Sequence, residues 1–184
     1  MIKDKVEIFS DRVHHVALGE ERVLQAINNN TDTPLETLVE VAVVCLREMD
    51  NFLLSKEEET EETALKYMND TAKLAQMGMA GYCYALGIEP NLTRVANQMV
   101  DTYKRKNADY GDSFGDSINH YGPVAAHVRM GDKVNRLQSL VLKKQTAQVK
   151  DESIADTYLD LACYAIMTLT DIEYKAQFAE EEEE

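Results

Sequence analysis

The sequence predicts an all-α protein, a bundle of about six helices. Two observations indicate this fold class. Apolar residues recur at helical spacing through most of the chain, and no alternating strand pattern of useful length appears. The chain also has only eight glycines and three prolines in 184 residues, too few for a turn-rich β sandwich or barrel. The length fits one domain, assigned to residues 1–179, and a disordered acidic tail at residues 180–184.

Each predicted helix has its own start or stop signal. Thr33 can cap the second helix, with Pro34 at its first position. Gly87 is a suitable stop for the third helix, and Pro123 fits the first turn of the fifth. Residues 107–122 hold three of the eight glycines and are expected to form a loop. The six predicted helices cover, approximately, residues 3–28, 34–54, 57–85, 91–106, 123–141 and 151–179.

Charge is distributed unevenly along the chain. The net charge is −14, which argues against a general binder of nucleic acid or anionic membrane, because such binding needs cationic side chains. Residues 101–150 nevertheless contain nine basic and five acidic residues. A locally basic segment in an acidic protein indicates either an anion site or pairing with the acidic surface, and the sequence leaves both open.

The chain has the features of a cytoplasmic protein. It opens on charged residues without a signal peptide, and no apolar run reaches the ~18 residues of a membrane span. Cys45, Cys83 and Cys163 lie far apart among apolar residues, so we expect free thiols and no disulfide or zinc framework.

Three carboxylates share one stripe of the sixth helix. Glu152, Asp156 and Asp160 are four residues apart, and the same stripe continues through the apolar Cys163 and Met167. Carboxylates that lead into a buried stripe need a positive partner. That partner could be Mg²⁺, which prefers carboxylate oxygens. It could equally be Lys133 or Arg136 of the fifth helix, and helical spacing alone favours such ion pairs.

Two further patterns indicate binding of a phosphate-bearing ligand. On the fifth helix Arg129, Lys133 and Arg136 share one side with Asp132, and an arc of cations suits a phosphate. An exposed polar face is the alternative. The segment 106–115 combines bases, small polar donors and aromatic rings, although it is not a P-loop. Gly111 there would allow a positive φ or a close approach of the backbone, and an aromatic ring could stack on a base. The candidate ligand-binding residues in this segment are Lys106, Asn107, Asp109, Tyr110, Gly111, Ser113 and Phe114.

Three blocks of sequence resemble a known family. KNADYGDSF at 106–114, RMGDKVNRL at 129–137 and DESIADTYLDLACYAI at 151–166 are similar, in this order, to the nucleotide modification associated domain 1 family. The resemblance covers about residues 95–170. Members of that family are frequent in phages, near genes of deoxynucleotide metabolism. The last block is also distantly similar to the acidic second motif of all-α, MazG-like nucleotide pyrophosphohydrolases, which hold Mg²⁺ between two acidic motifs.

We therefore carry three hypotheses of function. The first is a phage-type, Mg²⁺-dependent phosphohydrolase of a (deoxy)nucleotide, with Glu152 and Asp156 catalytic and Asp160 a further metal ligand. The second is a non-catalytic binder that sequesters a nucleotide or a nucleotide-derived signal. The third is an acidic inhibitor of another protein, based on the charge of −14. A homo-oligomer in the cytoplasm, that of the host if a phage encodes the chain, is expected for the first two.

Overall fold

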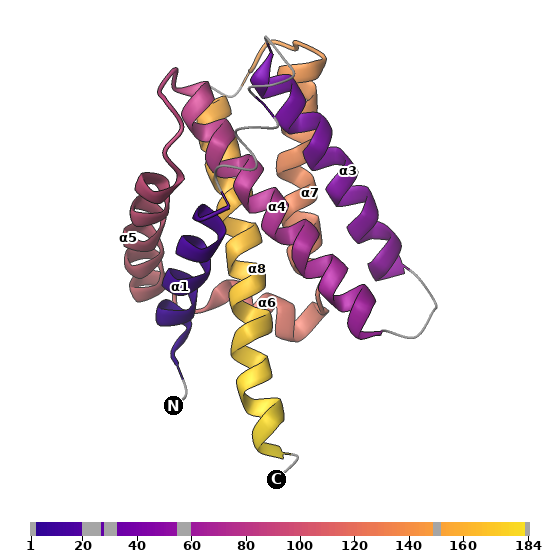
Figure 1. The fold of residues 1–184 in the computed structure, drawn as a ribbon, viewed down its shortest axis with the longest axis vertical. Coiled ribbons are helices and arrows are strands. Elements are labelled where there is room, and N and C mark those ends of the chain that lie inside the picture. Colours follow the sequence, from indigo (N-terminus) through magenta and orange to yellow (C-terminus); the bar gives the residue numbers. More distant parts are fainter. Residues whose placement is uncertain (1–2, 20–26, 28–32, 55–59, 149–151, 183–184) are drawn as a thin grey trace.

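The fold described here comes from a computed structural model, which describes residues 3–19, 27, 33–54, 60–148 and 152–182 (Figure 1). The side chains of residues 110 and 179–182 lie outside the description. The described elements are α1 (Lys5–Ala17), α3 (Pro34–Leu54), α4 (Glu61–Ala85), α5 (Leu92–Tyr110), α6 (Ser113–Tyr121), α7 (Val124–Leu137), the short π-helix η1 (Gln138–Leu142) and α8 (Ile154–Glu182). The predicted all-α bundle is confirmed, and no strand occurs in these ranges.

Helix α8 is the central element of the bundle. It packs most extensively against α4, and α7 and α1 cover further parts of it (Figure 1). Its middle turns are apolar nearly all round, and Leu161, Ala165 and Ile166 are fully buried. A helix of that composition is stable only inside a core, because burying apolar surface is the main favourable term in folding. The C-terminal end of α8 extends beyond the other helices (Figure 1).

A glycine brings α4 and α8 close together. A Cβ atom at Gly78 would lie 2.6 Å from the carbonyl oxygen of Tyr158 and 2.7 Å from the amide nitrogen of Ala162. No side chain therefore fits at Gly78 unless one of the two backbones moves. The side chain of the same Tyr158 links α8 to α3, because its phenol donates a hydrogen bond of 2.9 Å to the carbonyl oxygen of Leu35.

Two predicted boundaries are wrong. The first helix was expected to reach residue 28, but α1 ends at Ala17, where the amide groups of Leu18 and Gly19 turn back to the carbonyls of His14 and Val16. Residues 107–122 were expected to form a loop, yet they hold the end of α5 and all of α6.

The physical reason for the second error lies in the glycines. Gly111 and Gly122 adopt positive φ angles of 63° and 75° and terminate α5 and α6. Asp112 then caps α6 by accepting a hydrogen bond of 3.1 Å from the amide of Gly115. The turn chemistry thus marks the junction of two helices, and the positive φ expected at Gly111 is confirmed.

Three further predictions concern the C-terminal segment, the cysteines and membrane-spanning helices. Helix α8 continues to Glu182, into the segment expected to be an acidic tail, so the disorder of residues 180–184 stays a prediction. Cys45, Cys83 and Cys163 are free thiols, as expected. None of the described helices is long and apolar enough to cross a membrane.

Candidate functional site

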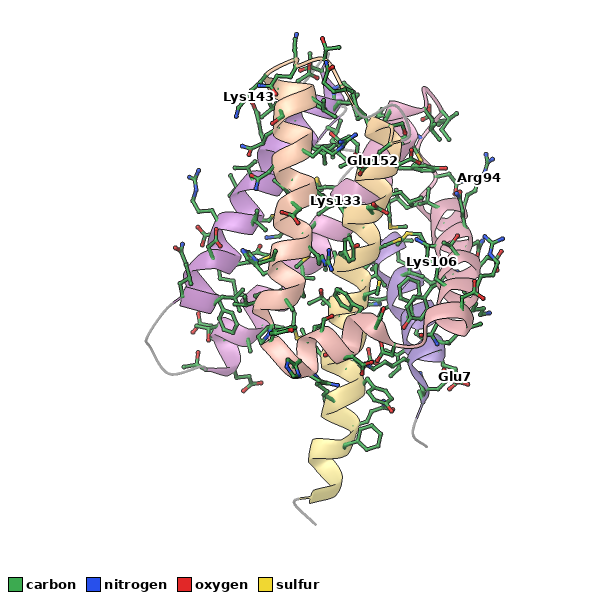
Figure 2. All side chains as sticks on the ribbon, turned by 180° about the vertical axis from the view of Figure 1, so that it is seen from behind. Glu7, Arg94, Lys106, Lys133, Lys143 and Glu152 are labelled. Carbon is green, nitrogen blue, oxygen red and sulfur yellow. The ribbon has the colours of Figure 1, made fainter. Side chains whose placement is uncertain are left out.

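A cavity of about 730 Å³ lies where α5, α6, α7 and the middle of α8 meet, a volume typical of small-molecule sites. The end of α5 and the start of α6 form one wall, the first half of α7 a second and α8 a third, while Phe9 of α1 closes one side. Figure 2 shows the helices around this region, with Lys106 between α5 and α8 and Arg94 at the outer side of α5.

Aromatic and apolar side chains make up much of the lining. Phe114 of α6 and Tyr164 of α8 stack with ring centroids 5.8 Å apart, and Phe9 stacks on Tyr103 at 4.0 Å. All four line the cavity, and the exposed Tyr121 lies at its rim. Aromatic faces of this kind bind nucleobases by stacking, whatever the base.

Four charged side chains also line the cavity: Lys106, Arg129, Asp112 and Asp160. Lys106 and Arg129 are exposed at its surface, and neither has an ion-pair partner among the described residues. Both carboxylates, by contrast, are neutralised from behind the wall by lysines that do not line the cavity.

Lys133 of α7 forms an ion pair with Asp160. Its ammonium nitrogen lies 2.9 Å from Asp160 and 3.1 Å from Glu152, and Arg136 also lies 3.5 Å from Glu152. Burial opposes the charge on Lys133, but the hydrogen bonds to Asp160 and Glu152 outweigh it and raise the pKa of this lysine. Arg136 further donates to the hydroxyl of Thr157 at 3.0 Å and to the carbonyl of Glu152 at 2.7 Å.

Lys5 of α1 forms an ion pair with the other lining carboxylate, Asp112. Its ammonium group donates to Asp112 at 2.5 Å and to the buried Asp171 of α8 at 2.7 Å. Burial opposes this charge too, and the hydrogen bonds to both carboxylates again give a raised pKa. Lys5 therefore ties α1 to the cap of α6 and to α8.

Asp156 has a local role at the start of α8. It accepts hydrogen bonds from the amide of Ser153 at 3.0 Å and its hydroxyl at 2.7 Å, while the Ser153 hydroxyl accepts from the amide of Asp156 at 3.0 Å. This reciprocal pattern is a capping box. The hydrogen bonds from Ser153 hold the pKa of Asp156 below its usual value.

These contacts engage the three carboxylates that were expected to bind magnesium. Lys133 already lies between Glu152 and Asp160, and Asp156 is engaged in the helix cap. Among the described residues, no group of three or more His, Cys, Asp or Glu side chains is arranged to hold a metal. The ion pairs that the spacing also allowed are present, and the magnesium site stays a prediction.

Cys163 contributes a thiol to the lining, and its surroundings disfavour the reactive thiolate form. Burial, and next the charge of Asp160, raise the pKa of its thiol to about 12. At neutral pH the sulfur stays protonated, and a protonated thiol is a poor nucleophile.

The region around the cavity matches a known family model. Residues 106–172 match the family model described as Nucleotide modification associated domain 1. This match confirms the resemblance seen in the three sequence blocks. No curated protein and no solved structure shows a significant match to the chain. The matched nucleotide modification associated domain 1 segment contains the end of α5, all of α6 and α7, and most of α8, which carry all of the cavity lining except Phe9, Thr102 and Tyr103.

The structure brings together only part of the site expected from sequence. The expected binding residues that line the cavity are Lys106, Asn107, Gly111, Ser113, Phe114 and Arg129, joined by Asp160. Asp109 is exposed outside the lining, and the side chain of Tyr110 lies outside the described residues. Lys133 and Arg136 form ion pairs with Glu152 outside the lining. Of the three cations expected to share one side of α7, Arg129 alone therefore lines the cavity.

Several lining residues were missed by sequence reasoning. Asp112 lies inside the segment that was singled out, and Tyr164 lies one turn after Asp160 on α8, so helical spacing could have found it. Met167 was placed on the carboxylate stripe of this helix but was not counted as a binding residue. Phe9 had no local signal, because only the packing of α1 against α5 brings it to the cavity.

Proposed function

We propose that this protein binds a phosphate-bearing nucleotide in the cavity between α5, α6, α7 and α8. One observation carries the proposal. Lys106 and Arg129 line the cavity without ion-pair partners among the described residues, whereas lysines hold both acidic residues of the lining. The cavity therefore presents positive charge in a protein whose net charge is −14.

The rest of the lining suits the other half of a nucleotide. The Phe114–Tyr164 pair offers ring surface for a base, and Asn107, Ser113 and Ser117 supply polar side chains for hydrogen bonds. The match of residues 106–172 to a nucleotide modification associated domain supports the same ligand class.

Binding is the function that the geometry supports best, ahead of hydrolysis. A phosphohydrolase of the expected kind would need Glu152, Asp156 and Asp160 for its metal, and these carboxylates already bind Lys133, Arg136 and the Ser153 cap. The hydrolase therefore remains a prediction. The phage origin, the cytoplasmic location, the homo-oligomeric state and the acidic-inhibitor hypothesis also stay predictions.

Isothermal titration calorimetry with the eight common ribo- and deoxyribonucleoside 5′-monophosphates and their triphosphates tests the proposal. We expect at least one nucleotide to bind, and Arg129→Ala or Lys106→Ala to weaken binding by about 1.5–3 kcal/mol, the contribution of a charged hydrogen bond. Product analysis of the same mixtures with Mg²⁺ separates a binder from a hydrolase.

Two matched controls remove the same charges outside the cavity. Lys104→Ala acts on the same helix as Lys106→Ala, and Arg94→Ala removes an exposed guanidinium from the start of α5 (Figure 2). Both controls should bind like the unaltered protein. If all four variants bind equally well, or if no nucleotide binds, the cavity is not a nucleotide site.

A further inference from the structure

The cavity has a definite capacity for negative charge. Lys106 and Arg129 are the two lining cations, and neither makes an ion pair with another described residue. The two lysines that contact lining carboxylates are already engaged: Lys133 binds Asp160 and Glu152, and Lys5 binds Asp112 and Asp171. The site thus offers two uncompensated positive charges.

The charge of a single phosphate group matches these two positive charges. A phosphate monoester carries about −1.5 to −2 charges at pH 7. Two cations at its surface neutralise it in full, and a guanidinium can bind two of its oxygens at once. We propose that the ligand is a nucleoside monophosphate, bound in preference to the di- and triphosphate of the same base; this inference rests on the proposed nucleotide-binding function.

Further phosphates would find no free cation among the lining residues. Asp112 and Asp160 are already paired with Lys5 and Lys133, so these two lysines have no charge to spare for a second or third phosphate. Drawing Lys133 or Lys5 toward the ligand would leave those carboxylates unpaired, which costs more than the new contact returns. Each step from mono- to triphosphate therefore adds charge that the lining does not compensate.

Magnesium could reduce the charge of a triphosphate in solution, so the measurement needs both conditions. Asp112 and Asp160 are held by lysines and are not free to bind an incoming metal. We expect the same order of affinity with Mg²⁺ and with EDTA.

The experiment compares the nucleoside, mono-, di- and triphosphate of the base that responds best, by calorimetry in EDTA and in Mg²⁺. The monophosphate should bind at least about tenfold more tightly than either the nucleoside or the triphosphate, as expected for a charged hydrogen bond gained or a charge left uncompensated. Tighter binding of the triphosphate in either condition would overturn the inference while leaving the nucleotide-binding function intact.

A new cation in the lining should change the preference. Val128 lines the cavity beside Arg129 and is 53% exposed, so Val128→Lys adds a third positive charge without disturbing the core. This variant should shift the ratio of diphosphate to monophosphate affinity about tenfold toward the diphosphate. Val44→Lys makes the same change on α3, outside the lining at 56% exposure, and should leave the ratio unchanged.

The outcomes separate the two claims. If Val128→Lys leaves the ratio of diphosphate to monophosphate affinity unchanged, the number of lining cations does not determine the preferred phosphate chain, even if the monophosphate binds best. Equal affinity for nucleoside and monophosphate would also overturn the inference, because phosphate would then contribute nothing. Failure of every nucleotide to bind would remove the proposed function itself.

Discussion

The ammonium group of Lys133 lies 2.9 Å from the carboxylate of Asp160, and only Asp160 of the two lines the cavity. The lysine therefore sets the charge that a ligand meets without touching the ligand. Asp160 keeps 41% of its side chain exposed, whereas Lys133 keeps 20%. An acidic residue can therefore line the proposed nucleotide site, because Lys133 compensates its charge.

Lys133→Met should weaken nucleotide binding although Lys133 does not line the cavity. The substitution leaves Asp160 unpaired and facing the ligand phosphate, and like charges repel. We also expect a loss of about 1–2 kcal/mol in the free energy of unfolding, below the figure for a fully buried pair because these side chains are partly exposed. Calorimetry and urea denaturation measure the two effects.

A double variant distinguishes charge from general damage. Adding Asp160→Asn to Lys133→Met removes the unpaired carboxylate, so affinity should recover. Lys143→Met, at an exposed lysine of the same segment, serves as the control (Figure 2). Affinity that stays low in the double variant would contradict the role assigned to this ion pair.

Lys5→Met tests whether α1, which lies outside the matched family segment, supports the cavity. The change leaves Asp112 without its lysine and the buried Asp171 with only Lys175, at 2.7 Å. We expect a stability loss of about 2–3 kcal/mol, because the pair is partly to largely buried. Nucleotide affinity should also fall, since Asp112 both lines the cavity and caps α6.

Lys3→Met is the matched control for this experiment. Lys3 pairs with Asp11 at 2.6 Å, but both side chains are about half exposed, so its loss should have a much smaller effect. Equal effects of the two substitutions on stability and affinity would show that the Lys5 contacts add nothing to the site.

The fold was largely predictable from local patterns, whereas the site was only partly so. Helical spacing and caps predicted both ends of α3 and the C-terminal end of α4 to the residue, and the aromatic and basic segment at 106–115 supplies one wall of the cavity. The spacing of residues along one helix does not predict which carboxylates form an ion pair with a lysine of another helix, because that depends on how α7 packs against α8. The contribution of Phe9 follows from contacts between helices far apart in sequence.

Asp156 should affect acid stability and not ligand binding. Its pKa is lowered in the folded protein, so its contribution to stability is complete above the unfolded value of 3.8 and disappears as pH falls through the folded value. Asp156→Ala should therefore flatten the fall in stability below about pH 4. It should also cost about 0.5–1 kcal/mol at neutral pH through loss of the cap.

Melting curves between pH 2 and pH 7 measure this dependence, with Asp132→Ala, at an exposed residue of α7, as the control. Nucleotide affinity of Asp156→Ala at pH 7 should equal that of the unaltered protein. A loss of affinity greater than tenfold would instead return Asp156 to the binding or metal site predicted from the sequence.

Two glycines in helices should respond in opposite directions to the same added methyl group. At Gly78 a Cβ would lie 2.6–2.7 Å from backbone atoms of α8, so Gly78→Ala must push α4 and α8 apart and should cost about 3 kcal/mol or more. At Gly131 of α7 the nearest atom that the Cβ would meet is a methyl carbon of Leu46 at 3.8 Å, an ordinary contact. Gly131→Ala should therefore stabilise the protein by about 0.5–1 kcal/mol, because alanine loses less backbone freedom than glycine in a helix.

Chemical denaturation of both variants checks this contrast. Because Gly131 lies two residues from both Arg129 and Lys133 without lining the cavity, Gly131→Ala should keep its nucleotide affinity as well. Equal destabilisation by the two substitutions would mean that α7 packs more tightly at Gly131 than described. A neutral Gly78→Ala would contradict the close approach of α4 and α8 at this glycine.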